Sequence, residues 1–158
     1  RYNQNISQAQ KQGFLVGSYH YFRTTSSVEE QFKNFKNATD NHTQDLIPMI
    51  DIEERINWDD FEFHENLKRF LELVEEEFNQ KPLIYTVNTF YNRYLHGKYT
   101  NYHFLIGRYG SKEPWMKDGS NWTIWQFSES GKIDGIDKSV DIDVVNSKYS
   151  LEDFQLKK

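Results

Sequence analysis

The chain contains no cysteine, and its five histidines are scattered at positions 20, 42, 64, 96 and 103. Without cysteine it can form neither a disulfide nor a thiolate metal site, and the redox compartment is left undecided. The histidines show neither an HExxH motif nor another close spacing that is typical of metal ligands. We therefore predict that the protein needs neither a metal nor another cofactor.

Long hydrophobic runs are also missing from the 158 residues. No stretch approaches the roughly 20 apolar residues of a membrane-spanning helix. The opening segment RYNQN at residues 1–5 is polar, so it is no signal peptide, and the chain does not begin with Met. We expect that an upstream segment was removed or is not included.

Positively charged residues are outnumbered by negatively charged ones. The chain has 19 Lys and Arg and 24 Asp and Glu, which gives a net charge of -5 and a pI near 5.5. This balance does not favour a polyanionic partner such as nucleic acid. Aromatic residues, by contrast, make up 16% of the chain. Flat apolar rings with polar rims suit both core packing and stacking on sugars.

The spacing of apolar residues predicts helices and strands that alternate in the first half of the chain. The strongest helix covers residues 59–78, where apolar residues recur at spacings of three and four. The expected helices cover residues 5–11, 26–38, 59–78 and 88–95, and the expected strands cover residues 14–22, 46–52, 81–87, 102–108, 121–128 and 140–145. A tight turn is expected at residues 131–136, and Ser150 is expected to cap a final helical turn.

Strands follow one another almost without helices in the second half of the chain. Alternating βα units argue for a parallel sheet, and the later strands argue for an irregular closure. We predict an α/β fold, an irregular (β/α) barrel of the TIM-barrel-like type whose last strands lack helices. At this length the chain is expected to form one catalytic-type domain over residues 1–158.

Two carboxylates, Asp51 and Glu53, lie at the end of the apolar strand that is expected at residues 46–52. Because side chains alternate along a strand, Asp51 and Glu53 should point the same way, with Cα atoms about 6.6 Å apart at a rise of roughly 3.3 Å per residue. One such carboxyl can stay ionised while burial and its neighbour push the other toward its acid form. Glycoside hydrolysis needs this division of labour. The alternative is that both acids are simply solvated at the end of a strand.

The carboxyl ends of the strands are where a barrel of this type carries its active site. Tyr21, Asp51, Glu53, Tyr85 and Gln126 would all fall there. The sequence therefore gathers acids, aromatic rings and an amide at one end of the predicted sheet.

Five segments in order resemble motifs of glycoside hydrolase family 25, the muramidase-type lysozymes of bacteria and phages. They are GSYHYF at residues 17–22, PMIDIE at 48–53, PLIYT at 82–86, WQFS at 125–128, and the closing element GI to VDID at 135–143. Each motif alone is weakly specific. Their order and their spread over nearly the whole chain make the resemblance strong.

The resemblance implies that Glu53 is the general acid that protonates the leaving oxygen of the bond after N-acetylmuramic acid. Asp51 and Asp141 would be flanking carboxylates that favour the protonated form of Glu53 and stabilise oxocarbenium charge. Whether Asp51 attacks, orients the N-acetyl group of the substrate or only supplies field is left open. The alternative for Asp141 is a turn residue ahead of a strand.

Aromatic side chains and one amide are the candidates for sugar contact under this resemblance. They are Tyr19, Tyr21, Tyr85, Trp125 and Gln126. Tyr19 and Tyr21 share a face of their strand, since they are two residues apart. Most aromatic residues must serve the core, so those at strand tips are favoured.

Two departures from the family pattern bear on the site. Family members begin with a strand that carries an early Asp, followed by a helix and a second strand, a piece on the order of 30 residues. We expect the chain to be N-terminally incomplete in this respect, with that acid and the first strands missing. Asp143 also stands where the family often has Asn, which puts an amide role there in doubt.

The resemblance predicts a lysozyme that cleaves the β-1,4 bond between N-acetylmuramic acid and N-acetylglucosamine. Its partner would be peptidoglycan, and its place of action would be extracytoplasmic; the oligomeric state stays undetermined. One alternative is a catalytically impaired glycan-binding relative on the same fold. A polysaccharide deacetylase would also want a strand-end Asp, but it would need closely spaced histidine ligands, which the sequence lacks.

Overall fold

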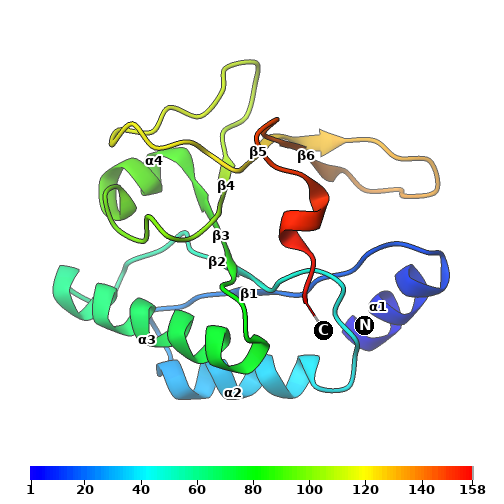
Figure 1. The fold of residues 1–158 in the computed structure, drawn as a ribbon, viewed down its shortest axis with the longest axis horizontal. Coiled ribbons are helices and arrows are strands. Elements are labelled where there is room, and N and C mark those ends of the chain that lie inside the picture. The colour runs from blue at the N-terminus through cyan, green and yellow to red at the C-terminus, as the bar shows by residue number, and fades with distance from the viewer. Residues whose placement is uncertain (158) are drawn as a thin grey trace. The chain divides into compact units, whose positions relative to one another are not determined.

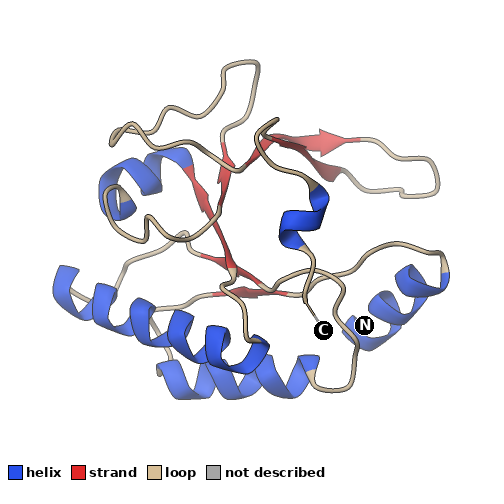
Figure 2. Ribbon diagram, in the orientation of Figure 1, coloured by secondary structure: helices blue, strands red, loops and turns tan. Residues whose placement is uncertain are grey.

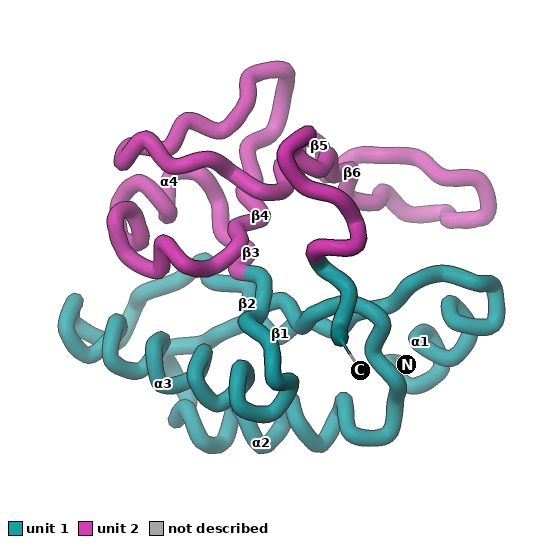
Figure 3. Tube along the Cα trace, viewed as in Figure 1, with its two compact units in different colours: residues 1–83, 154–158 teal, residues 84–153 magenta. Residues whose placement is uncertain are grey.

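The computed structural model describes residues 1–157 and divides them into two compact units (Figure 3). Unit 1 comprises residues 1–83 together with the C-terminal segment that begins at Phe154, and unit 2 comprises residues 84–153. The single domain expected over residues 1–158 stays a prediction. No helix of the described chain is both long enough and apolar enough to cross a membrane.

Unit 1 holds the long helices of the chain and two short strands (Figures 1 and 2). In order, these elements are α1 (Tyr2–Lys11), β1 (Tyr19–Tyr21), α2 (Val28–Thr39), β2 (Met49–Asp51) and α3 (Asp60–Phe78). Strands β1 and β2 are parallel, and Tyr21 is the register partner of Asp51. This pairing places the last residue of one strand directly beside the last residue of the other.

Local signals in the sequence explain where α2 and α3 begin. The Ser27 hydroxyl caps α2 by accepting a hydrogen bond from the backbone N–H of Glu30 at 3.3 Å. The Asp59 carboxylate caps α3 in the same way, with the N–H of Glu62 at 2.8 Å. Side-chain caps of this kind satisfy backbone donors that have no partner inside the helix. The predicted helices therefore start within a residue or two of their expected positions.

Aromatic rings fill the space between β1 and the helices of unit 1. The Phe70 ring of α3 lies 5.0 Å from the His20 ring and 5.2 Å from the Phe22 ring, measured between centroids. Ile50 and Ile52 are fully buried, and Ile50 is the register partner of His20. Since strand side chains alternate, this face belongs to the core, and the opposite face carries Tyr21 and Asp51.

Unit 2 contains mainly strands and loops (Figure 2). Its elements are β3 (Leu83–Val87, whose first residue belongs to unit 1), α4 (Asn88–Phe90), the π-helical turn η1 (Tyr91–Leu95), β4 (Phe104–Gly107), β5 (Ile124–Gly131), β6 (Val140–Val145) and the 3-10 turn η2 (Leu151–Phe154, whose last residue belongs to unit 1). β3, β4 and β5 run parallel, while β5 and β6 are antiparallel with irregular register. As predicted, the last strands follow one another without helices in the described chain.

Two predicted strands of unit 1 are shorter than expected. The strand over residues 14–22 is reduced to Tyr19–Tyr21, and the strand over 46–52 is reduced to Met49–Asp51. The preceding residues meet through loop contacts instead, because the Val16 carbonyl accepts the N–H groups of both Asp45 and Leu46. Leu46 also forms an isolated antiparallel bridge with Gln155. Apolar runs alone do not reveal such competing partners.

Candidate active site

The tip of β2 carries the carboxylates of unit 1. Strand pairing continues past Tyr21, since the N–H of Phe22 donates to the Asp51 carbonyl at 2.8 Å. Ile50 and Ile52 turn into the core, so Asp51 points to the opposite face. Glu53 follows the end of β2, and its charge acts on the Asp51 carboxyl. The shared face predicted for the two acids stays a prediction.

Burial perturbs the Asp51 carboxyl strongly. Removal of water, followed by the negative charge of Glu53, raises the pKa of Asp51 from 3.8 to about 7. Among residues 1–157, its buried Oδ1 atom has no hydrogen-bond partner. A carboxyl with this pKa keeps its proton at mildly acidic pH, where an ordinary aspartate has lost it.

A third carboxylate, Glu54, joins this group, and the sequence analysis gave it no role. Burial raises the pKa of Tyr21, and the charges of Glu54, Glu53 and Asp51 raise it further. These three acids therefore act on one phenol at the end of β1. The Glu54 Oε1 atom is also buried, with no hydrogen-bond partner in the described part of the chain.

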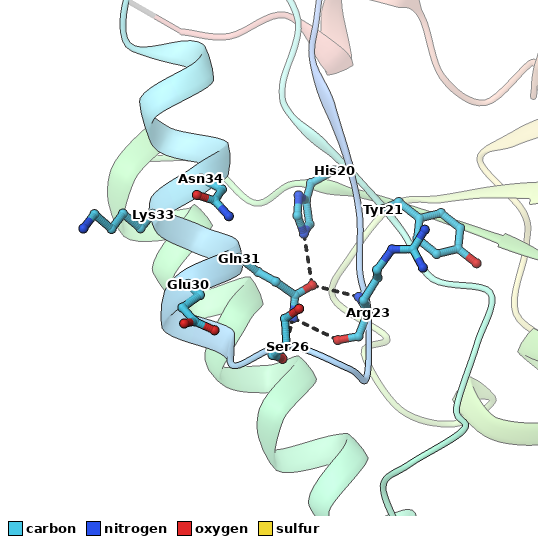
Figure 4. A pocket seen from close by; sticks show the side chains of 8 residues that line it. All are labelled: His20, Tyr21, Arg23, Ser26, Glu30, Gln31, Lys33 and Asn34. Atoms are coloured by element: carbon cyan, nitrogen blue, oxygen red, sulfur yellow. Dashed lines mark hydrogen bonds between the residues drawn. The ribbon is translucent and has the colours of Figure 1, made fainter.

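A glutamine of α2 holds the loop that follows β1 (Figure 4). The Gln31 Oε1 accepts hydrogen bonds from the Arg23 N–H at 2.8 Å and shares one with His20 Nε2 at 3.1 Å. Its Nε2 donates to the Arg23 carbonyl at 2.9 Å and to the Ser26 carbonyl at 3.0 Å. Gln31 is almost fully buried, so this network fixes the loop rather than binding solvent.

The network places Arg23 against the phenol of the site. The Arg23 guanidinium lies 4.9 Å from the centroid of the Tyr21 ring, a cation–π contact that Figure 4 shows. Both residues line a pocket of about 450 Å³ beside α2. Burial lowers the pKa of His20 despite its bond to Gln31, so this imidazole is neutral at pH 7.

In unit 2, a side-chain hydrogen bond joins β3 to β5 across the intervening strand β4. The Tyr85 hydroxyl of β3 donates to Gln126 Oε1 of β5 at 2.9 Å. Gly107 of β4 lies between them, and a Cβ added there would stand 2.8 Å from the Tyr85 hydroxyl and 3.3 Å from Gln126 Oε1. A side chain at this position would force the Tyr85 hydroxyl to shift. Glycine at position 107 thus leaves room for the bond, and the strand pattern of the sequence gives no signal for this.

Tyr109 extends the same group. Its hydroxyl also donates to Gln126 Oε1, at 3.3 Å. Burial raises its pKa, the Tyr85 hydroxyl opposes this, and the charges of Glu129 and Asp141 raise it further. Tyr109 follows β4 just as Glu53 follows β2, so the strand-end rule could have identified it.

The carboxylates of β6 form the acidic part of unit 2. Asp143 is the register partner of Gln126. The residue reaches the surface, but the surrounding protein still removes water from its carboxyl, and with the charge of Asp141 this raises the pKa of Asp143 to about 6. Asp143, which the sequence analysis marked only as a departure from Asn, is therefore an ionisable group of this cluster.

The other two aromatic candidates lie apart from these clusters within their own units. Tyr19 is 65% exposed near the start of β1, two residues from Tyr21 on the same face. Trp125 points to the face of β5 opposite Gln126. Its indole N–H donates to the Arg108 carbonyl at 2.7 Å, and its ring meets Trp122 and Phe127. A role for either in sugar binding stays a prediction.

No three His, Cys, Asp or Glu side chains within residues 1–157 are grouped so that they could hold a metal ion. Unit 1 contains the acidic pair Asp51 and Glu53, in which the pKa of Asp51 is raised. Unit 2 contains a phenol–amide cluster, formed by Tyr85, Tyr109 and Gln126, together with the carboxylates of Asp141 and Asp143. Two neighbouring acids at a strand end are the groups that glycoside hydrolases use, so the site is compatible with that class.

Comparison with known proteins identifies the family. Residues 1–136 match the model of "Glycosyl hydrolases family 25", and the chain belongs to this family. A family 25 glycosyl hydrolase from Bacillus anthracis superimposes with a TM-score of 0.81 at 27% identity, covering 93% of this chain and 72% of that one. This likeness confirms the predicted α/β fold of the irregular barrel type.

Two curated relatives place the chain in context. "Uncharacterized protein YegX" of Escherichia coli is 31% identical over 154 residues, which cover 98% of this chain and 56% of the relative. "Autolytic lysozyme" of Clostridium acetobutylicum is 25% identical over 135 residues, which cover 85% of this chain and 40% of the relative. The chain thus spans about half the length of the curated relatives it matches.

The raised pKa of Asp51 predicts a pH-dependent stability. Because the folded state holds this proton more tightly than the unfolded state, the free energy of unfolding should fall as the pH rises from 3.8 to about 7. Asp51→Asn removes the ionisation and should stabilise the protein at pH 8 by about 2 kcal/mol, a value discounted for partial solvent access, with little effect at pH 4. Thermal melts of both proteins at the two pH values measure this. The exposed Glu76→Gln serves as control, and an equal effect at pH 4 and pH 8 would contradict the argument.

The absence of a side chain at Gly107 predicts that the effects of substitutions at positions 107 and 85 on stability are coupled. Gly107→Ala should destabilise the protein by about 1–3 kcal/mol, since the new methyl group meets the Tyr85 hydroxyl. In the Tyr85→Phe background, where that oxygen is gone, the same substitution should cost less than half as much. Denaturant unfolding of the four proteins in this double-mutant cycle gives the comparison. Equal costs in both backgrounds would show that the hydroxyl does not require the glycine.

Proposed function

We propose that the protein hydrolyses the β-1,4 bond between N-acetylmuramic acid and N-acetylglucosamine in peptidoglycan. The observation that carries the proposal is the acidic pair at the tip of β2, where burial and the charge of Glu53 raise the pKa of Asp51 to about 7. A glycosidase needs one carboxyl that holds a proton at working pH beside one that can carry negative charge. Membership of family 25 supports this assignment.

In the proposed mechanism, the raised pKa of Asp51 keeps one proton at the acidic pair up to about pH 7. Glu53 delivers it to the glycosidic oxygen as the bond breaks, so the leaving sugar departs as an alcohol. Both carboxyls are then ionised, and their negative charges stabilise the oxocarbenium ion that forms on the other sugar. Water adds to the anomeric carbon of that sugar and returns a proton to the acidic pair, which completes the cycle.

The residues of unit 2 receive the roles of substrate contact. Tyr85 and Gln126 hold each other in place, and the Gln126 side-chain N–H₂ is left as a donor toward a sugar hydroxyl or N-acetyl oxygen. Tyr19, Tyr21 and Trp125 are proposed as further aromatic contacts. Asp141 is proposed as a flanking carboxylate, accompanied by Asp143 with its pKa of about 6.

The place of action follows from the proposed substrate. Peptidoglycan lies outside the cytoplasm, so an extracytoplasmic site of action is part of the proposal. "Autolytic lysozyme", the name of the Clostridium acetobutylicum relative, supports a role on a cell wall.

Replacement of the proposed acid is the direct test. Glu53→Gln keeps the shape of the side chain and removes the proton donor, so kcat on purified peptidoglycan should fall by about 100-fold or more. The release of reducing sugar ends measures the rate. Glu76→Gln makes the same chemical change on the exposed face of α3 and should leave the rate unaltered.

Outcomes of this test separate hydrolysis from binding. Wild-type turnover in the Glu53→Gln variant would remove Glu53 from the mechanism. A wild-type protein that binds peptidoglycan but releases no sugar ends would favour the glycan-binding relative instead.

The proton kept at the acidic pair also predicts a pH profile. Since the proton is lost as the pH rises through about 7, kcat should fall above this value, approaching tenfold for each further pH unit. Initial rates between pH 5 and pH 9 on peptidoglycan would show this limb. A rate that stays constant up to pH 9 would mean that the raised pKa of Asp51 has no part in catalysis.

A further inference from the structure

A second pocket lies in unit 2 at the ends of β3 and β4. It has a volume of about 360 Å³, within the usual range for small-ligand sites. Its lining combines two aromatic residues with polar side chains and a strand-end glycine: Val87, Asn88, Thr89, Gly107, Arg108, Tyr109 and Trp115. None of the roles assigned under family 25 includes Trp115.

Trp115 is exposed although its backbone is firmly held. It is 63% exposed, so a ligand can reach its indole ring. Its carbonyl accepts hydrogen bonds from Asn88 Nδ2 at 2.9 Å and from Asn92 Nδ2 at 2.8 Å. Asn92 Oδ1 accepts the N–H of Lys117 at 2.7 Å, so one side chain holds the loop at the tryptophan and two residues after it.

The loop between β4 and β5 is fixed at its beginning as well. In Figure 1 it runs from the end of β4 past α4 to β5. The Arg108 Nη1 donates to the Glu113 carbonyl at 2.5 Å, and the Gly110 N–H donates to the Phe127 carbonyl at 2.9 Å. An aromatic ring on a braced loop is pre-organised for binding, because little conformational entropy is lost when a ligand arrives.

The pocket is continuous with the phenol–amide cluster. Tyr109, which is 50% exposed, lines the pocket and donates its hydroxyl to Gln126 Oε1 at 3.3 Å. Gly107 likewise belongs to both, since it lines the pocket and makes room for the Tyr85–Gln126 bond. A chain molecule that contacts Gln126 can therefore reach Trp115 without leaving this face of unit 2.

We infer that Trp115 and Tyr109 form a binding subsite for one pyranose ring of a β-1,4-linked N-acetylhexosamine chain. A pyranose presents an apolar C–H face that suits a flat indole and a rim of hydroxyls that suits Asn88, Thr89 and Arg108. This combination of flat rings and hydrogen-bonding side chains fits a sugar better than an apolar peptide. The inference rests on the proposed function, because it adds a sugar contact to the same substrate.

Binding can be tested without turnover. In the Glu53→Gln background, the Kd for an N-acetylglucosamine tetramer should rise about tenfold with Trp115→Ala, the scale of one aromatic contact. Trp115→Tyr keeps a flat ring and should restore most of the affinity. Phe61→Ala removes an aromatic residue of α3 that is 76% exposed, and it should leave the Kd unchanged. Calorimetric titration measures all four proteins, and thermal melts establish that each is folded.

Activity gives a second measurement. With the natural Glu53, Trp115→Ala should raise KM on long glycan strands by more than it lowers kcat, as expected when a contact is lost from ground state and transition state alike. An unchanged Kd in the folded Trp115→Ala protein, or equal losses in Trp115→Ala and Trp115→Tyr, would overturn the subsite. So would a folded protein that binds no tetramer.

The two proposals fail in distinguishable ways. If the wild type never cuts peptidoglycan but loses tetramer affinity with Trp115→Ala, the subsite stands and the hydrolase assignment falls. If the wild type cuts peptidoglycan and Trp115→Ala binds and turns over normally, the hydrolase assignment stands and the subsite falls.

Discussion

Burial of Ile50 and Ile52 is the constraint on which the acidic site of unit 1 depends. Both side chains are fully inaccessible to solvent, on the face of β2 that continues the core formed by His20 and Phe70. Because strand side chains alternate, this burial leaves Asp51 no choice of direction. Register with β1 then sets Tyr21 beside it. A one-residue shift of the register would turn Asp51 into the core, so the packing of Ile50 and Ile52 also keeps this acid in its position.

The same hydrophobic packing sets the electrostatics. A carboxyl that folding forces partly out of water resists ionisation, and the neighbouring Glu53 adds repulsion. The raised pKa of Asp51 implies a lower stability at neutral pH than at acidic pH, and it keeps a proton at the site up to about pH 7. Gln31 contributes from the other side of the core, since its amide fixes the backbone of Arg23 and thereby the cation that faces Tyr21.

In unit 2, the arrangement of the site depends on a residue without a side chain, Gly107. The bond from Tyr85 to Gln126 spans two strand spacings, and it exists because Gly107 contributes no Cβ between them. The bond orients the amide, and Tyr109 connects that amide to the pocket of Trp115. Side chains from β3, β4, β5 and the loop after β4 thus form one surface, although they are far apart in the sequence.

Much of this could be predicted from the sequence. The helices at residues 26–38 and 59–78, the α/β class and the direction of Asp51 away from Ile50 all follow from local periodicity and capping, which depend on near neighbours in the chain. Other features depend on partners far along the chain. The strands of unit 1 are short because Val16 and Leu46 find loop partners, and Gly107 leaves the space that the bond between Tyr85 and Gln126 occupies. The pKa of Asp51 likewise depends on how much water the folded chain removes, and this quantity has no counterpart in a linear sequence.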